Sequence, residues 1–175
     1  MIYKSFLGLA ICSLLVVFGL TDKFQKKVDK IVKSAFDIET FSMTEKIFPE
    51  TIISTLSSEF LNNNFFEIIN QDVLLGYAYV SKAPSKTDSF DYLILFDKDL
   101  VIMNSKVLAY REDYGGEIGS KRWLKQFNGK TTSDKLIYGD NIAAISGATI
   151  SVKSMTNAIN NVLKSIKILQ QNKEL

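Results

Sequence analysis

Three neighbouring stretches decide the expected fold: VLLGYAYV at residues 73–80, FDYLILF at 90–96 and LVIMNSKVLAY at 100–110. All three are rich in β-branched and aromatic residues, which favour strands. A polar loop at 82–89 separates the first two, and the tight turn at 97–99 separates the last two. Because strands joined by short connections pair antiparallel, these stretches predict a twisted antiparallel meander.

Helical spacing of apolar residues appears on both sides of the meander. Residues 151–175 predict one amphipathic helix whose apolar stripe packs into the core. Two earlier helices are predicted at 24–36 and at 49–61, the second with Pro49 in its first turn. The expected fold class is therefore α+β, with a twisted antiparallel sheet packed by helices. The stripe of the last helix consists of Val152, Met155, Ile159, Val162, Ile166 and Leu169.

An uncharged run at residues 5–21 precedes this body and begins directly after Lys4. Its length is the lower limit for a helix that spans a membrane. A short basic start followed by such a run also fits a secretory signal. The sequence thus predicts a signal anchor or signal peptide at 1–21, a linker helix at 22–40 and one domain at 41–175.

The orientation of the domain depends on two opposing signals. Five lysines between Lys23 and Lys33 follow the apolar run, and the positive-inside rule alone would place the body in the cytoplasm. Acidic residues and helical spacing instead make these lysines resemble a solvated helix face, and N-terminal signals usually export the domain attached to them. We expect an outward-facing domain on the periplasmic side of a bacterial cytoplasmic membrane, or an exported protein.

The composition excludes several kinds of chemistry. A formal charge of +2, from 21 basic and 19 acidic residues, is too balanced for nucleic-acid binding. The chain has no histidine, and its one cysteine, Cys12, lies in the apolar run. A Ser-His-Asp triad, a Cys-His dyad, an ordinary zinc site and an iron–sulfur cluster are all excluded, and no metal site is predicted. Redox work would require an organic cofactor.

One motif stands directly before the last helix. It reads ISGATIS at 145–151 and comes after a strand-like stretch at 142–144. A small-residue turn that opens a helix can bind phosphate, because the first helical N–H groups are unpaired and the helix dipole favours an anion. Thr149 would offer its hydroxyl there. The alternative is that Ser146, Thr149 and Ser151 are ordinary N-cap residues.

The segment Ser146-Gly147-Ala148-Thr149, with Ile150 and Ser151 after it, resembles the flavinylation motif of the FMN-binding domain family. That family includes the flavin-carrying subunits of the sodium-pumping NADH:quinone reductase and of the Rnf complex. The resemblance implies that a separate, magnesium-dependent FAD:protein FMN transferase joins FMN to Thr149 by a phosphoester. The threonine is then an acceptor, and no catalytic residue is predicted.

A second stretch, 110–118 together with 123–130, resembles the other signature of the family, so that the resemblance extends over 73–163. Here Gly115 and Gly116 are expected to bring backbone amides to the isoalloxazine or the ribityl chain, unless the pair is a plain loop. Glu112 and Glu117 are expected to hydrogen-bond the flavin or orient that loop. Trp123 and Phe127 are interpreted as core. The predicted cofactor-binding set is Thr149, Ser146, Gly147, Ala148, Ser151, Glu112, Gly115, Gly116 and Glu117.

The chain departs from the family pattern at one position. The family usually has an aspartate three residues before the serine, where this chain has Ala143. We expect a membrane-anchored or exported electron carrier with covalent FMN, which works with the transferase and with redox partner proteins. The alternatives are a flavin-dependent reductase of a small substrate, and a cofactor-free binding or sensory module that has lost flavinylation.

Overall fold

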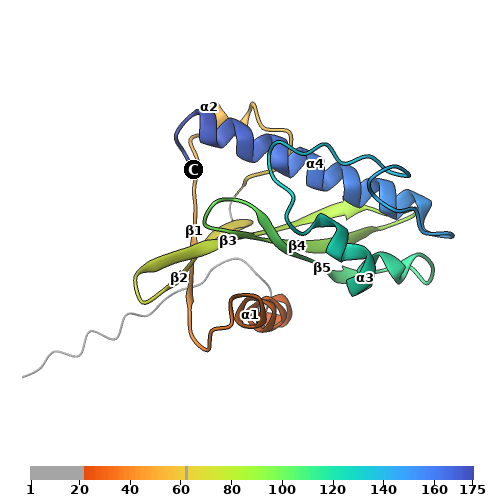
Figure 1. The fold of residues 1–175 in the computed structure, drawn as a ribbon, viewed down its shortest axis with the longest axis horizontal. Coiled ribbons are helices and arrows are strands. Elements are labelled where there is room, and N and C mark those ends of the chain that lie inside the picture. The colour runs from red at the N-terminus through yellow and green to blue at the C-terminus, as the bar shows by residue number, and fades with distance from the viewer. Residues whose placement is uncertain (1–21, 62) are drawn as a thin grey trace, which may run out of the picture.

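A five-stranded antiparallel sheet with helices on both faces forms the body of the protein (Figure 1). The computed structural model describes residues 22–61 and 63–175. The strands are adjacent in chain order, β1-β2-β3-β4-β5, which confirms the predicted α+β class. The strands are β1 (Ser42–Glu45), β2 (Phe65–Asn70), β3 (Val73–Pro84), β4 (Ser89–Asp97) and β5 (Ile102–Tyr110). The helices are α1 (Asp22–Phe36), α2 (Glu50–Ile53), α3 (Lys121–Leu124) and α4 (Thr149–Gln171), with 3₁₀ turns η1 (Gly116–Gly119) and η2 (Lys125–Phe127).

The predicted meander is confirmed as β3, β4 and β5. Pairing between β3 and β4 continues to Pro84 and Ser89, so the connection is shorter than the predicted loop. At the next turn the Asp97 carboxylate accepts hydrogen bonds from the backbone N–H groups of Asp99 and Val101, both at 2.9 Å. This local capping explains why an Asp-rich turn closes the hairpin.

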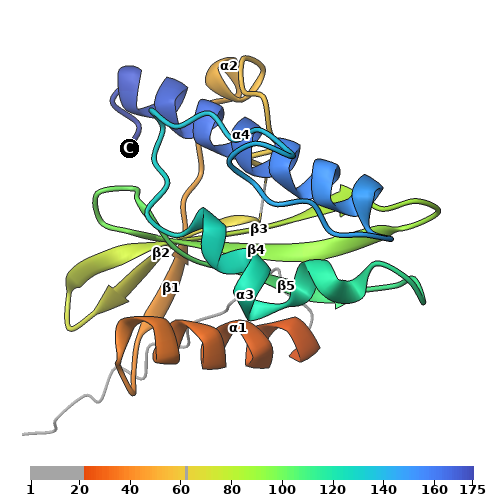
Figure 2. The ribbon, with the colours of Figure 1, turned by 45° about the vertical axis from the view of Figure 1, so that its right-hand side comes forward.

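Helix α4 covers one face of the sheet, and its contacts form the larger core (Figures 1 and 2). All six residues of the predicted apolar stripe are fully buried there. They meet aromatic side chains from the strands, among them Tyr79, Phe90 and Phe96. Since burial of one such side chain stabilises a fold by roughly 1.5 to 3 kcal/mol, this stripe fixes α4 on the sheet.

Helix α1 covers the opposite face. Its Val28 and Val32 are fully buried in a second cluster that includes Leu93, Leu95 and Leu108 of the sheet. The predicted helix is confirmed. The sequence led us to expect that it links the domain to the N-terminal segment, whereas in the structure α1 packs against the sheet as part of the domain. Amphipathic spacing shows that a helix has an apolar face and leaves open what that face covers.

Two predictions about the remaining elements are wrong. The helix expected at 49–61 is only the single turn α2, because the chain beyond it is held by other elements: the N–H groups of Ser57 and Ser58 donate to Ser165 Oγ of α4, each at 2.9 Å. The stretch at 142–144 is no strand, and Ile142 forms only an isolated bridge with Tyr138. Strands β1 and β2 were not predicted from the sequence.

The predicted signal segment at 1–21 lies outside the residues that the structure describes. From residue 22 onward, leaving aside residue 62, none of the helices combines the length and the apolar character needed to cross a bilayer.

Candidate functional site

A cleft of about 880 Å³ opens at one end of the sheet. Three segments meet there: the β3–β4 connection, the loop after β5 and the start of α4, which Figures 1 and 2 both show at the same end of the molecule. Of the nine residues in the predicted cofactor-binding set, all except Gly116 line this cleft. Tertiary folding therefore brings the two signatures together.

The first turn of α4 leaves its amides free of side-chain caps. Ala148 is the N-cap residue, and no side chain caps the helix there. The first intrahelical bond runs from Val152 N to Ala148 O at 2.9 Å, so the N–H groups of residues 149–151 have no intrahelical acceptor. The interpretation of Ser146, Thr149 and Ser151 as N-cap residues is thus wrong.

Thr149, the predicted acceptor in the motif, is exposed at the start of α4. Thr149 is the first residue of α4 and lines the cleft. Before it, Gly147 has φ +80°, a conformation that L side chains rarely adopt, and no atom lies within 4 Å of the position of a Cβ there. Ala148 between them is buried. The turn thus presents Thr149 outward while Ala148 anchors it to the core.

Tyr110, at the end of β5, connects the glycine loop to α4. Its hydroxyl donates to Tyr114 O and therefore accepts from Ser151 Oγ, both at 2.9 Å. Gly115 has φ +87°, and a Cβ on it would lie 2.6 Å from the Tyr110 hydroxyl oxygen and 3.5 Å from Ala148 Cβ. Only glycine fits this position without strain, because the backbone has a positive φ and the Tyr110 hydroxyl lies too close to a Cβ. The adjacent Gly116 begins η1 and does not line the cleft.

Glu112 holds the opposite wall of the cleft. Its Oε1 accepts hydrogen bonds from Ser85 Oγ (2.7 Å) and from the backbone N–H groups of Thr87 (2.6 Å) and Asp88 (3.0 Å). The bond from Ser85, and then that from Thr87 N, lowers the pKa of Glu112 to about 2. Glu112 therefore orders the β3–β4 connection, which is a different loop from the one expected. Glu117, on η1, is exposed and lines the cleft.

Several lining residues were not predicted from the sequence. Arg111 forms an ion pair with Asp91, which is buried in β4, and donates to Ser89 O at 3.0 Å. Its position after the last predicted strand was the available signal, because residues at strand ends often line sites. The other lining residues of this kind are Lys86, Thr87, Asp88, Tyr110, Asp113, Tyr114 and Ile150.

Trp123 and Phe127, the aromatic residues of the second signature, lie in the core beside the segment that leads to Thr149. Trp123 and Phe127 are buried with their rings edge to face, 5.1 Å between centroids, which confirms their interpretation as core. The Trp123 indole N–H donates to Ala143 O at 2.8 Å, and Ala143 N donates to Gln126 Oε1 at 2.8 Å. The segment leading to Thr149 is thereby fixed at both backbone groups of Ala143, whose side chain is exposed.

The fold and the cleft define an α+β domain that presents uncapped helix amides and an exposed hydroxyl at one site, a combination that suits a phosphate-bearing ligand. Residues 87–164 match the FMN-binding domain family, and this match assigns that part of the chain to the family. The resemblance inferred from the motifs is confirmed. The matched range begins at the β3–β4 connection and ends within α4, so it contains every predicted site residue. Comparison with curated proteins found no match.

The residues present fit FMN in two respects. The free N–H groups of residues 149–151 and the dipole of a 23-residue helix favour an anionic group beside Thr149. The cleft volume of about 880 Å³ also falls in the range of pockets that hold organic cofactors. The match to the FMN-binding domain family suggests a flavin-binding role of the electron-transfer type.

Proposed function

We propose that this protein is an electron carrier whose FMN is joined through its phosphate to Thr149. One observation carries the proposal: the Thr149 hydroxyl lies exposed at the first position of α4, beside amides that no side chain caps. A helix start normally recruits a Ser, Thr, Asp or Asn cap, and this one leaves its N–H groups available to a ligand.

The roles of the surrounding residues depend on their positions. The N–H groups of residues 149–151 would hold the phosphate, and Gly147 would let it approach the backbone. The loop at Gly115 and the residues of the β3–β4 connection, ordered by Glu112, would flank the rest of the cofactor. Bound FMN supplies reversible one- and two-electron chemistry, which no side chain of this chain offers.

Attachment requires a second protein, a FAD:protein FMN transferase. In this transfer Thr149 Oγ1 forms a bond to the FMN phosphorus of FAD, the pyrophosphate bond breaks, AMP leaves, and the hydroxyl proton is released. No electrons are exchanged. The exposure of Thr149 supports this route, since the transferase must reach the hydroxyl.

We further propose that the domain works at a membrane, anchored by residues 1–21 and facing the periplasmic side, or is exported. The apolar run that ends at Thr21, one residue before α1, supports this. Redox partner proteins would deliver and remove electrons. A carrier is favoured over a small-substrate reductase because the chain has no histidine and its cysteine lies in the apolar run, which leaves few proton donors of suitable pKa.

A second candidate function rests on Ala143. If the transferase recognises the usual aspartate of the motif, this chain is a cofactor-free binding or sensory module. Full-length protein produced with and without the transferase distinguishes the two. Intact mass and flavin that survives acid precipitation should report one FMN per chain in the wild type and none in Thr149→Val.

A matched control is Thr132→Val, the same change at a threonine outside the cleft, which should retain the flavin. Colourless wild-type protein made with its transferase would overturn the carrier and favour the module. Reductant and small acceptors supplied without partner proteins test the reductase alternative, because rapid turnover would contradict the carrier.

A further inference from the structure

A second groove, separate from the cofactor cleft, lies along the outer edge of β5. It has a volume of about 430 Å³ and lies between α1 and α3. No residue lines both hollows. The site proposed for FMN therefore does not account for it.

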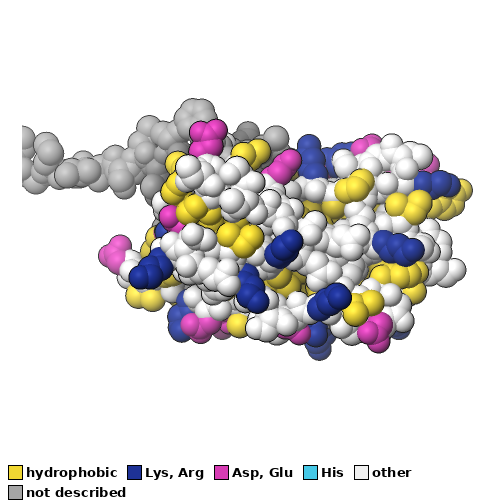
Figure 3. Space-filling model, turned by 90° about the horizontal axis from the view of Figure 1, so that it is seen from above, with side chains coloured by type: hydrophobic (Ala, Val, Ile, Leu, Met, Phe, Trp, Pro, Cys, Tyr) yellow, Lys and Arg dark blue, Asp and Glu magenta, His cyan; other side chains and the backbone are white. Residues whose placement is uncertain are grey.

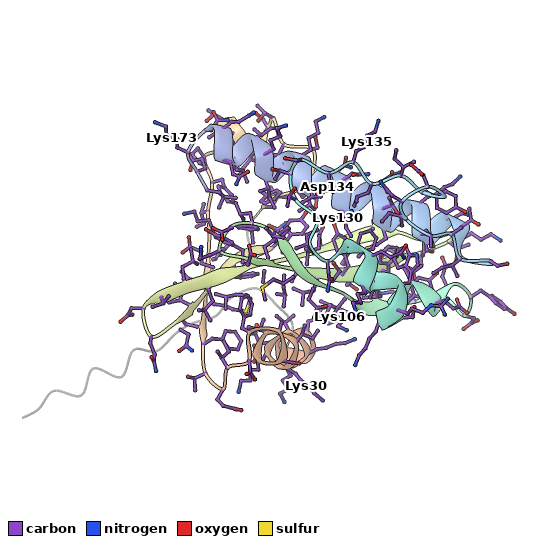
Figure 4. The ribbon with its side chains drawn as sticks, in the orientation of Figure 1. Lys30, Lys106, Lys130, Asp134, Lys135 and Lys173 are labelled. Carbon is purple, nitrogen blue, oxygen red and sulfur yellow. The ribbon has the colours of Figure 1, made fainter. Side chains whose placement is uncertain are left out.

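The groove concentrates positive charge. Lys30 of α1, Lys106 of β5, Lys121 of α3 and Lys125 of η2 all line it, and no Asp or Glu does. Figure 4 shows Lys30 on α1 and Lys106 on β5. Burial, and then the nearby charge of Lys121, lowers the pKa of the Lys106 amine, as expected where positive charges are not neutralised.

These lysines differ from others on the protein. Across the described residues, none of the four forms an ion pair, whereas Lys130 is paired with Asp134 at 3.4 Å (Figure 4). On the α4 face, basic side chains stand apart from one another (Figure 3). Four unpaired lysines around one hollow repel each other, and an anion would relieve that repulsion.

A buried hydroxyl provides an independent indication. Ser105 lines the groove and is only 1% exposed, and its Oγ has no hydrogen-bond partner among the residues that the structure describes. Buried polar atoms are nearly always paired, so an unpaired one in a groove indicates a missing partner. A serine hydroxyl can donate to an anionic oxygen.

We infer that this groove binds a phosphate group carried by a larger molecule. Lysine ammonium groups are compact charges that bind phosphate well, and Ser105 adds a neutral donor. The groove of about 430 Å³ is larger than a single phosphate ion, which leaves room for an organic substituent on the phosphate. The source is either a soluble phosphorylated metabolite or the head group of an anionic phospholipid.

The full-length protein in phosphatidylcholine nanodiscs allows a test that reads each lysine separately. Acetylation rates, followed by mass spectrometry, should fall several-fold at the four groove lysines and not at Lys135 or Lys173, which lie on the α4 side (Figure 4). One arm adds inorganic phosphate against chloride at equal ionic strength. The other replaces part of the phosphatidylcholine by phosphatidylglycerol.

Protection by inorganic phosphate supports a soluble ligand, and protection by phosphatidylglycerol supports a lipid head group. Absence of protection in both arms, or equal protection of Lys135 and Lys173, overturns the inference. The double variant Lys30→Gln with Lys106→Gln should abolish protection of Lys121 and Lys125. Its control, Lys135→Gln with Lys173→Gln, removes the same charge and should preserve it.

Ser105→Ala provides a second variant that leaves the charge intact. It should weaken protection without lowering stability, because it removes a hydroxyl that has no partner within the described chain. Unchanged protection in both Ser105→Ala and the Lys30/Lys106 double variant would show that the ions bind elsewhere.

Discussion

The hydroxyl of Tyr110 lies 2.9 Å from Oγ of Ser151, two residues that are 41 positions apart. This contact joins the end of β5 to the first turn of α4. It also places the glycine loop against the helix start, because the same hydroxyl binds Tyr114 O. The geometry of the cleft therefore depends on one phenol group.

Tyr110→Phe should destabilise the full-length protein by about 1 to 2 kcal/mol, because it removes both hydrogen bonds and leaves the buried Ser151 hydroxyl unpaired. Urea unfolding followed by the fluorescence of Trp123 measures this. The control Tyr114→Phe removes a hydroxyl from a ring that is 84% exposed and should be nearly neutral. Equal stability of the two variants would contradict the structural role of Tyr110.

Gly115→Ala should cost about 2 kcal/mol or more, from the strain of a positive φ together with the close approach to Tyr110. Gly129→Ala isolates the first contribution: Gly129 has φ +79° and nothing lies within 4 Å of the Cβ position. This control should cost about 1 kcal/mol. If both variants lose the same stability, the contact between residue 115 and Tyr110 is unimportant.

Glu112 should make stability depend on pH. Its pKa is lowered from 4.5 to about 2 in the folded protein, so it contributes stability above its unfolded pKa that is lost as the pH falls towards about 2. Glu112→Gln should be less stable than wild type at neutral pH, and the difference should shrink between about pH 4.5 and 2. Denaturation at a series of pH values measures it.

The control for that series is Glu117→Gln, at an exposed carboxylate that also lines the cleft. It should leave the pH profile of the free energy of unfolding as in wild type. A gap between Glu112→Gln and wild type that stays constant down to pH 2 would show that the Ser85 and Thr87 contacts do not depend on the charge.

Ala143→Asp should raise the yield of acid-stable flavin when the chain is produced with the transferase. The side chain is exposed and both backbone groups are fixed by Trp123 and Gln126, so an aspartate fits without disturbing the fold and should change stability by less than about 0.5 kcal/mol. Ala144→Asp adds the same charge one residue later and should have no such effect. A matching gain from Ala144→Asp would attribute the effect to net charge.

How far the sequence predicts this fold depends on the range of the interactions. The stripe of α4 and the strands β3, β4 and β5 were predicted correctly, because periodicity and β-branched composition act within each segment. The helix predicted at 49–61 stops after one turn, and the N–H groups of Ser57 and Ser58 donate to Ser165 Oγ of α4 instead of to the preceding turn. No local pattern carries that information.

The candidate site also combines features that depend on neighbouring residues with features that depend on distant ones. Residues 145–151 are contiguous, so the turn that we propose binds the phosphate could be identified from the sequence itself. The donors that bind Glu112 lie 24 to 27 positions before it, so no local pattern in the sequence shows that Glu112 contacts the β3–β4 connection. Tyr110 and Arg111 were overlooked because their partners come from other strands and from α4.

Local patterns in the sequence were enough to predict the α+β class, the helices α1 and α4 and the small-residue turn that ends at Thr149, because each arises from steric and hydrophobic preferences of neighbouring residues. Packing of distant segments was needed to place α1 on the sheet, to leave the amides of α4 uncapped at Ala148, and to bring four lysines from separate elements to the groove that Ser105 also lines. These features depend on which distant surfaces exclude water from each other, and that is settled only when the whole chain packs.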